Sequence, residues 1–329
     1  MTAIAASYHD RVNVLQGTMP QDASPFDRPE WYALLAQRKM PLVAMASDGQ
    51  NTAALALTRA KGRIEPLNHW YSFTWRQLAP VGEDGDRLLG AIAHGLRAQT
   101  HRVTLSPVPD EDGSASRLER AFRDAGWIVH REQCDFNHVL PVNDRSFAEY
   151  WASRPGRMRT TLKRKAKKVE VELLTRFDET AWGAYEEIYA QSWKPAEETP
   201  EILRKFAREE GDAGRIRLAI ARHEGRPIAA QFWTVENGVA YIHKLAHLEE
   251  TRNLSAGTTL SAALFEHVID IDNVGLVDFG TGNDSYKADW MEKVRPRFLI
   301  DCLDPRQPRS WAPLAKRFLT RLAQRPSES

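Results

Sequence analysis

An internal repeat is the feature that most constrains the fold of this 329-residue chain. Residues 41–58 read as a strand, an Asp-Gly turn and a second strand, and residues 216–235 have the same layout with Glu-Gly in the turn. Residues 71–108 then predict strand, loop, helix and strand, and residues 239–280 repeat that order with similar spacing. The pattern predicts two copies of one α/β unit, with a boundary near residues 141–155.

Composition is that of an ordinary soluble globular protein. Hydrophobic residues make up 42% and charged residues 27%, and the formal net charge is +1. A chain so close to neutral has no overall attraction for nucleic acid or for an anionic membrane. Cys134 and Cys302 form no CxxC pattern, so we expect neither a disulfide framework nor a metal site. We find no signal peptide or membrane-spanning segment in the sequence and therefore expect a cytoplasmic protein.

The two copies differ where the loop meets the helix. In the first copy this junction carries three acids, Glu83, Asp84 and Asp86. Such acids satisfy the helix dipole themselves and repel a phosphate. In the second copy the junction, residues 251–259, is free of acids and contains Arg252 and Gly257. An ordinary helix start with Ser255 as N-cap also fits this stretch, but if one copy binds a phosphorylated ligand at exposed backbone N–H groups, we predict the second.

A polar cluster follows the last buried strand of the second copy. Residues 275–300 predict a strand, a Gly-rich turn, a short helix carrying Tyr286 and Trp290, and a final strand. The cluster consists of Asp278, Asn283, Asp284, Tyr286 and Lys287. Because α/β sheets usually build their sites just past strand ends, these residues are site candidates, although the glycines are equally explained by the turn alone.

A basic segment precedes the second copy. Residues 154–168 contain eight lysines and arginines and no acid, among them Arg157 and Lys163. Met158, Leu162 and Ala166 lie four residues apart, which predicts a helix with one narrow apolar stripe. The segment is either a solvated helix face or an anion-binding helix for a phosphorylated donor, a nucleotide-linked acceptor or RNA.

These stretches together resemble the GNAT-type acyltransferase fold, in its CelD-like and FemAB-related branch. The likeness rests on the basic helix, on GRPIAAQFWTVENGVAYIHKLAH followed by the LSAG loop, and on VDFGTGNDSYKADW. The last stretch is similar to that branch's Asp-Phe-x-x-Gly…Tyr-Lys…Trp signature, here at Asp278, Phe279, Tyr286, Lys287 and Trp290. Ala256 stands where members commonly have proline, in Ser-Pro-Gly.

The resemblance covers residues 146–303 well and the first half as a diverged copy. It implies an α/β (α+β) fold of tandem GNAT-like units, each a mixed, centrally splayed β-sheet flanked by helices. We therefore expect a degenerate GNAT-like domain at residues 1–145. We expect an acyltransferase domain with a short basic tail helix at residues 146–329.

The implied activity is transfer of an acyl group, such as acetyl, from acyl-CoA to an amine without a metal, as in cell-envelope or polysaccharide biosynthesis. The resemblance places the donor pyrophosphate on Arg252, Asn253, Leu254, Ser255, Ala256, Gly257 and Thr258. It suggests Tyr286 as the acid for the leaving thiolate and either His243 or Asp278 as the base. Packing inside the strand explains His243 equally well. Acceptor-binding candidates are Asn283, Asp284, Lys287, Trp290, Arg157 and Lys163.

Two other functions stay open. FemAB-related enzymes can use aminoacyl-tRNA, which the basic helix would then contact. A non-catalytic partner in envelope-polymer assembly is the third reading. The expected partner is a small-molecule or a lipid- or sugar-linked amine, with no DNA, and tRNA only as that alternative donor. In the tail, Leu314, Phe318 and Leu322 form a stripe among Lys316, Arg317, Arg321 and Arg325. We expect this helix to dock onto the body rather than onto an anionic membrane.

Overall fold

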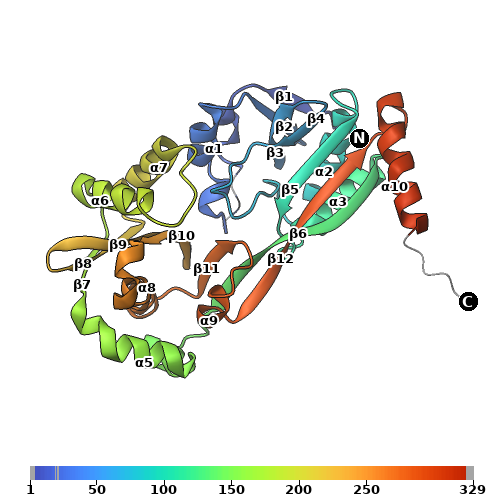
Figure 1. The fold of residues 1–329 in the computed structure, drawn as a ribbon. Coiled ribbons are helices and arrows are strands. Elements are labelled where there is room, and N and C mark those ends of the chain that lie inside the picture. The colour runs from blue at the N-terminus through green and yellow to red at the C-terminus, as the bar shows by residue number, and fades with distance from the viewer. Residues whose placement is uncertain (1–3, 19, 21, 324–329) are drawn as a thin grey trace, which may run out of the picture. The chain divides into compact units, whose positions relative to one another are not determined.

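The chain folds into two compact units (Figure 1). The computed structural model describes residues 4–18, 20 and 22–323, with side chains as far as residue 319. Unit 1 comprises Met1–Asp135 and Pro296–Ser329, and unit 2 comprises Phe136–Arg295. Each unit contains mixed β-sheet flanked by helices, which confirms the predicted tandem α/β fold.

In unit 1 the strand order is β1-β2-β3-β4-β5-β12. Neighbours are antiparallel except β4 and β5, which are parallel. The strands are β1 Ser7–His9, β2 Pro41–Ser47, β3 Thr52–Ala60, β4 Arg63–Pro66, β5 Arg102–Val108 and β12 Lys293–Leu303. The helices are α1 Pro29–Ala36, α2 Glu83–Leu96, α3 Ser114–Asp124 and α10 Trp311–Ala323, with short helical turns η1 Val12–Leu15, η2 Pro25–Asp27 and η6 Pro308–Ser310.

In unit 2 the strand order is β6-β11-β10-β9-β8-β7, with β10 and β11 parallel and the other neighbours antiparallel. The strands are β6 Ile128–Pro141, β7 Glu170–Leu174, β8 Ile216–His223, β9 Arg226–Glu236, β10 Val239–His247 and β11 Leu276–Thr281. The helices are α4 Phe147–Ala152, α5 Gly156–Lys165, α6 Glu179–Ala190, α7 Pro200–Asp212, α8 Ala256–Glu266 and α9 Lys287–Trp290, with turns η3 Ala166–Lys168, η4 Glu249–Leu254 and η5 His267–Ile271.

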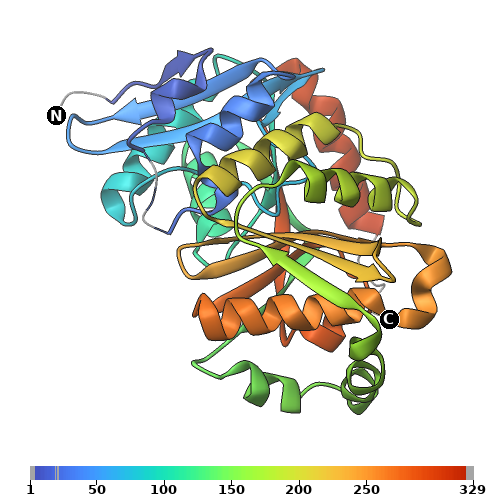
Figure 2. The same cartoon turned by 90° about the vertical axis from the view of Figure 1, so that its left-hand side faces the viewer.

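Helices cover both faces of the unit 2 sheet (Figure 2). Successive residues of a strand point to opposite faces, and both Phe232 and Trp233 of β9 are fully buried. Phe232 packs edge-on against Trp182 of α6, whereas Trp233 packs edge-on against Phe265 of α8. The aromatic pair therefore fixes α6 on one face and α8 on the other.

Strands β6 and β12 each pass from one unit to the other. The part of β6 from Asn137 to Pro141 pairs with β11, and the part of β12 from Phe298 to Leu303 pairs with β5. The predicted division at residues 145 and 146 is therefore wrong for the C-terminal segment, which completes unit 1. The reason is physical: a hydrophobic pattern predicts a strand but not the strand that hydrogen-bonds to it.

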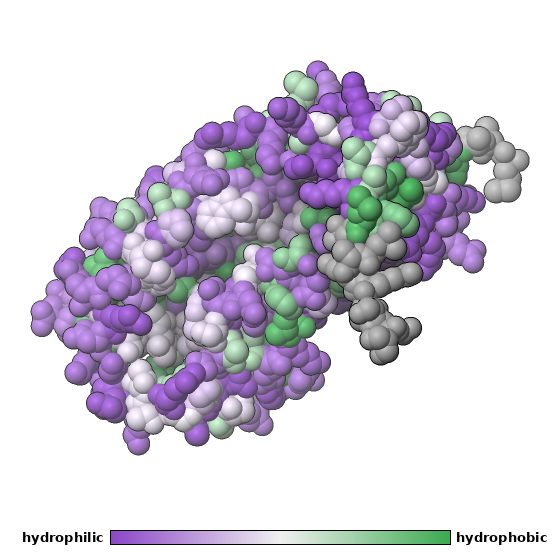
Figure 3. All heavy atoms as spheres, turned by 45° about the vertical axis from the view of Figure 1, so that its right-hand side comes forward, coloured by the Kyte–Doolittle hydropathy of each residue, from purple (hydrophilic) through white to green (hydrophobic). Residues whose placement is uncertain are grey.

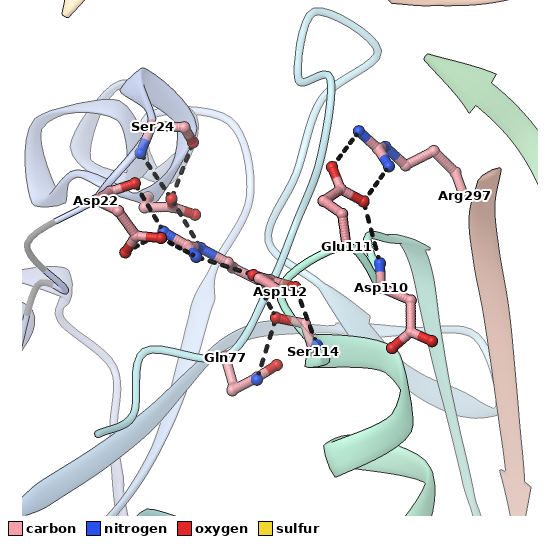
Figure 4. A network of polar contacts seen from close by, with 10 residues as sticks. Asp22, Ser24, Gln77, Asp110, Glu111, Asp112, Ser114 and Arg297 are labelled. Carbon is pink, nitrogen blue, oxygen red and sulfur yellow. Dashed lines mark hydrogen bonds and ion pairs between the residues drawn. The ribbon is translucent and has the colours of Figure 1, made fainter. Parts of the chain in front are cut away.

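Buried ion pairs attach the returning segment to unit 1 (Figure 4). The guanidinium of Arg297 on β12 is 1% exposed and binds both oxygens of Glu111, at 2.8 and 3.0 Å. Beside it, Arg76 binds Asp27 at 3.1 Å and Asp112 at 2.9 Å. Because a buried arginine left without its carboxylate is costly, the Arg297 pair fixes the loop after β5 against β12, and the Arg76 pairs fix the same loop to η2.

The repeat predicted most elements correctly but misplaced one strand. The two hairpins appear as β2–β3 and β8–β9, and α2 and α8 follow as expected. Residues 71–75, read as a strand, are not in a strand; the strand of this region is β4. Tyr71, Phe73 and Trp75 are all buried, and the Trp75 indole N–H donates to the Ala56 carbonyl at 2.9 Å. A packed loop of alternating aromatic residues thus mimics the period of a strand.

Candidate active site

The central strands of unit 2 separate partway along their length. β10 and β11 pair from Val239 with Leu276 to Tyr241 with Asp278, and both strands then continue without pairing to each other. A cleft of about 430 Å³ adjoins their diverging ends. Its lining residues are Met158, Trp193, Leu245, His247, Thr251, Arg252, Ser255, Ala256, Gly257, Thr258, Ser261, Phe279, Tyr286, Asp289 and Trp290.

A bulge in β10 separates the paired part of the strand from the part that lines the cleft. The register of β10 against β9 shifts between Ile242 and Lys244, at His243. Beyond the shift, Leu245 and His247 line the cleft. Bulges re-aim the residues that follow them, so this irregularity sets which side chains of β10 face the opening.

The start of α8 forms one wall of the cleft. Ser255 has a left-handed backbone with φ 54° and ψ 38°, and no side chain caps the helix. The first amides of an uncapped helix have no partner within it and carry the positive end of its dipole. A Cβ built on Gly257 lies 3.7 Å from His247 Cδ2, an ordinary contact, so packing does not require glycine there. The space that this glycine leaves open belongs to the cleft.

Two cations accompany these amides. Arg252 lines the cleft and has no ion pair among the described residues. Lys165, at the end of α5, donates a hydrogen bond from Nζ to Ser255 Oγ at 3.1 Å. Arg252 was predicted from the sequence and Lys165 was not, because nothing in the basic run distinguishes the one lysine that reaches α8. Helix dipole and side-chain charge together make this wall suitable for an anion.

Tyr286 lines the same cleft from the β11–α9 segment. Its side chain is 40% exposed and packs edge-on against Phe279, with ring centres 5.7 Å apart. Burial, with a contribution from Asp284, raises the pKa of the Tyr286 phenol. The hydroxyl therefore stays protonated at neutral pH and can donate a hydrogen bond. Trp290 is 6% exposed and stacks on Phe265, so it forms the floor of the cleft.

The turn that presents Tyr286 is held by a buried lysine. Gly280 and Gly282 have φ of 71° and 94°, a backbone region that favours glycine. Lys287 is 4% exposed, and its ammonium donates to the Thr281 carbonyl and, at 3.4 Å, to that of Gly282. In this structure Lys287 closes the turn rather than lining the cleft.

The two candidate bases do not line the cleft. His243 Nε2 lies 2.7 Å from Thr234 Oγ1, and its ring stacks on Phe232 at 4.9 Å. Asp278 is 6% exposed and accepts hydrogen bonds from the Asn137 amide at 3.1 Å and the Gly280 backbone at 2.7 Å. Both side chains have surroundings typical of structural residues.

The remaining predicted residues are dispersed around the cleft. Asn253 and Leu254 belong to η4 and do not line it. Asn283 Oδ1 lies 3.2 Å from His138 Nε2, whereas Asp284 is exposed. Arg157 binds Asp289 at the rim at 2.5 Å. Lys163 lies exposed on α5 outside the lining.

Several wall residues carried no sequence signal. Met158 comes from α5, Trp193 from the segment between α6 and α7, and His247 from the end of β10. Trp193 and His247 stack with ring centres 4.4 Å apart. Their shared role depends on tertiary packing, which no local pattern reports.

The corresponding junction of unit 1 is different. The first turn of α2 carries three acids, Glu83, Asp84 and Asp86. Arg117 binds Asp86 at 2.6 Å, and Arg87 binds Asp84 at 3.1 Å. The helix start is thus surrounded by its own ion pairs and is not built to receive a phosphate.

A family model for the acetyltransferase (GNAT) domain matches residues 156–288, which include α5, α8 and the β11–α9 turn. No curated protein matches the sequence significantly.

Solved structures resemble nearly the whole chain. The C-terminal domain assigned to a lysylphosphatidylglycerol synthetase of Agrobacterium fabrum superposes with a TM-score of 0.60 at 13% identity, covering 92% of this chain and 94% of that one. FemX gives 0.58 at 10% identity, covering 82% and 90%. A tandem GNAT protein from the clavulanic acid biosynthesis pathway gives 0.51 at 14% identity, covering 90% and 98%. Residues 156–288 therefore match the GNAT domain, and the chain as a whole has a tandem GNAT-type fold like that of these solved structures.

Proposed function

We propose that unit 2 transfers an acyl group, such as acetyl, from acyl-CoA to an amine. The observation that carries this proposal is the uncapped start of α8, which faces a cleft shared with Arg252 and Tyr286. The α8 amides, Arg252 and Lys165 would bind the pyrophosphate of the donor. The pantetheine arm would then run between the diverging ends of β10 and β11, toward the Tyr286 hydroxyl.

The chemistry requires one bond to form and one to break. The neutral amine attacks the thioester carbonyl, the carbon–nitrogen bond forms, and the carbon–sulfur bond of the tetrahedral intermediate breaks. Tyr286 donates its proton to the leaving thiolate and regains one from solvent. His243 and Asp278 are committed to other partners, so the amine loses its proton to water, and orientation of the two substrates supplies most of the acceleration.

The acceptor class is proposed from the relatives. The name of the Agrobacterium fabrum protein refers to a lipid that carries a lysyl group, which supports the lipid linkage of the acceptor but not its amine. A lipid- or sugar-linked amine of the cell envelope is the acceptor we would test first, beside small-molecule amines.

Calorimetric titration of the purified chain with CoA and acetyl-CoA tests the donor site. We expect binding that Gly257→Val weakens and Gly183→Val leaves unchanged. Gly183 lies on α6 with open space at its Cβ position, so it is the matched helix glycine. Equal CoA affinity in both variants would contradict the assignment of the pyrophosphate site to the start of α8. Absence of any CoA binding would overturn the proposed function.

One observation favours a second donor, aminoacyl-tRNA. Helix α5 lies against α8 and exposes Arg159, Lys163 and Arg164, with Lys167 and Lys168 exposed just beyond it. Phosphate contacts of RNA would give binding a steep salt dependence, and each lysine or arginine replaced by glutamine would flatten that slope. Binding of bulk aminoacyl-tRNA that shows this behaviour, together with no binding of CoA, would establish the second donor instead.

A further inference from the structure

Helix α10 of unit 1 presents an apolar face to solvent. Trp311, Phe318 and Leu319 are 59%, 64% and 64% exposed. They stand at i, i+7 and i+8 and so share one face of the helix. Figure 3 shows hydrophobic side chains gathered over this helix on the molecular surface. The expectation that this stripe docks onto the body is therefore wrong for Phe318. The side chains of Arg321 and Leu322, and Arg325, lie outside the described residues.

The other side of α10 is anchored to unit 1 by polar contacts. Arg317 donates a hydrogen bond to Asp301 of β12, which is fully buried. Asp301 also binds Arg102 at 2.8 Å. At the start of the helix the Trp311 indole N–H donates to the Pro305 carbonyl at 3.0 Å. These contacts orient the helix, so the exposed apolar face is a consequence of how it is attached.

A basic cavity lies beside the start of this helix. It has a volume of about 600 Å³ and is lined by Arg59, Arg63, Arg97, His101 and Arg309 with no acidic residue in its wall. Arg97 is bound to Asp304 and Arg63 to Glu65, whereas Arg309 has no partner among the described residues. Pro308 and Arg309 belong to η6, which ends at Ser310, immediately before Trp311. The cavity and the apolar face are therefore joined through η6.

Charge distinguishes between the partners that such a surface could take. From residue 305 to residue 327 the chain has six arginines and lysines and no acid. A second copy of the chain would place this cationic segment against itself in a two-fold interface, which like charges oppose. A nucleic acid would leave the apolar residues without a matching environment. An anionic phospholipid surface offers both an acyl boundary for Trp311, Phe318 and Leu319 and phosphates for the arginines.

We propose that unit 1 binds anionic phospholipid membranes through α10 and the basic cavity. The apolar face of α10 enters the headgroup boundary, and the cavity receives a headgroup phosphate. Among the described residues no helix is long and apolar enough to cross a bilayer. Membrane binding therefore takes two weaker signals, apolar insertion and charge, and each is separately testable.

Sedimentation of the full chain with vesicles tests the proposal. Vesicles of phosphatidylcholine mixed with phosphatidylglycerol should bind the chain, and pure phosphatidylcholine should not. Phe318→Ser with Leu319→Ser should lower the partition constant about tenfold. Arg59→Gln and Arg309→Gln should each lower it about fivefold and weaken its salt dependence. Met40→Ser and Arg120→Gln, exposed at unit 1 positions outside the helix and the cavity, should bind like wild type.

Further measurements distinguish membrane binding from free-phosphate binding, dimerisation and misfolding. Soluble glycerol phosphate should compete only weakly, because it lacks the apolar boundary; binding of free phosphate without vesicle binding would overturn the proposal. Light scattering would reveal a dimer that Phe318→Ser dissolves, and such a dimer without vesicle binding would also overturn it. Retained binding of CoA shows that the apolar variant is folded. The donor-site variant Gly257→Val should still bind vesicles, so failure of the proposed activity and failure of membrane binding are distinguishable.

Discussion

Lys165 at the end of α5 donates a hydrogen bond to Ser255 at the start of α8, across 3.1 Å and 90 positions of sequence. Ser255 has a left-handed backbone, so its side chain does not cap α8. The contact brings a cation to the positive end of a helix with uncapped amides. Two positive groups held together without an acid between them form a site that an anion stabilises.

Replacement of this lysine should weaken the donor site specifically. We expect Lys165→Gln to raise the Kd for CoA about tenfold, because a charge-assisted hydrogen bond to phosphate is lost. Lys168→Gln is the control, since Lys168 lies in the same basic segment but is exposed, whereas Lys165 is half-buried and bonded to Ser255. Calorimetric titration of both variants checks this, and an equal loss in both would mean that the basic segment acts only through its general charge.

A side chain at position 257 should be compatible with folding but should interfere with CoA binding. Gly257→Val should retain the melting temperature of wild type within a few degrees and bind CoA at least about tenfold more weakly, because the valine occupies the place of the pyrophosphate. Arg252→Glu should act in the same direction by charge. Thermal melts with and without CoA give both readings. Unaltered CoA stabilisation in the two variants would contradict the assignment of this wall.

The Tyr286 hydroxyl should affect turnover and not donor affinity. Tyr286→Phe removes only the proton donor, so we expect kcat to fall about a hundredfold with the Kd for CoA unchanged. Since burial raises the pKa of Tyr286, ionisation of this phenol should not limit activity below pH 10. Thiol release with an accepted amine, measured across pH, is the assay. Unchanged kcat in the variant would leave Tyr286 as a packing residue of the cleft wall.

The acidic residues at the start of α2 in unit 1 should have no effect on CoA affinity. Glu83→Gln with Asp84→Asn removes two charges at the start of α2, and CoA affinity should remain that of wild type. The physical reason is that this junction already satisfies its dipole and belongs to unit 1. A large change in Kd would reverse the roles assigned to the two units.

The ion pairs of Asp304, which hold the C-terminal segment to unit 1, should lose their contribution to stability at low pH. Burial opposes ionisation of Asp304, but hydrogen bonds from Arg97 and Arg306 outweigh it and lower the pKa of Asp304 to about 2. A lowered pKa contributes stability above pH 4 that is lost as the pH falls toward 2, about 2 kcal/mol in total. The difference in unfolding free energy between wild type and Asp304→Asn should therefore narrow by that amount over this range. Asp124→Asn, at an exposed position, should show no such narrowing.

Local chemistry explains what the sequence predicted well. An acid-free junction with Arg252 and Gly257 is a property of a few consecutive residues, and the structure places both in the cleft with Tyr286. The repeat likewise predicted the hairpins, because turn residues and alternation are local. His243 was harder to interpret, since a histidine in a strand reads the same whether it faces a cleft or packs between Phe206 and Phe232.

The features that the sequence did not predict depend on contacts between distant segments of the chain. Trp193 and His247 line the cleft from two separate elements, and Lys165 of a third element donates a hydrogen bond to Ser255 in its wall. No residue pattern within any one of these elements predicts its contact with the others. The last strand was assigned to the second domain for the same reason, because nothing in residues 298–303 indicates that β5 is its neighbour.

The exchange of β6 and β12 has a consequence for the order in which the protein matures on the ribosome. Arg102 and its partner Asp301 are 199 positions apart, and all of unit 2 is translated between them. Domains generally fold as they emerge, from the N-terminus onward. Here unit 2 is a continuous segment that has its full set of strands first, while unit 1, begun earlier, waits for its last strand until unit 2 has been made. Unit 1 therefore begins to be translated first but completes its sheet last, and the edge of β5 remains unpaired until β12 is made.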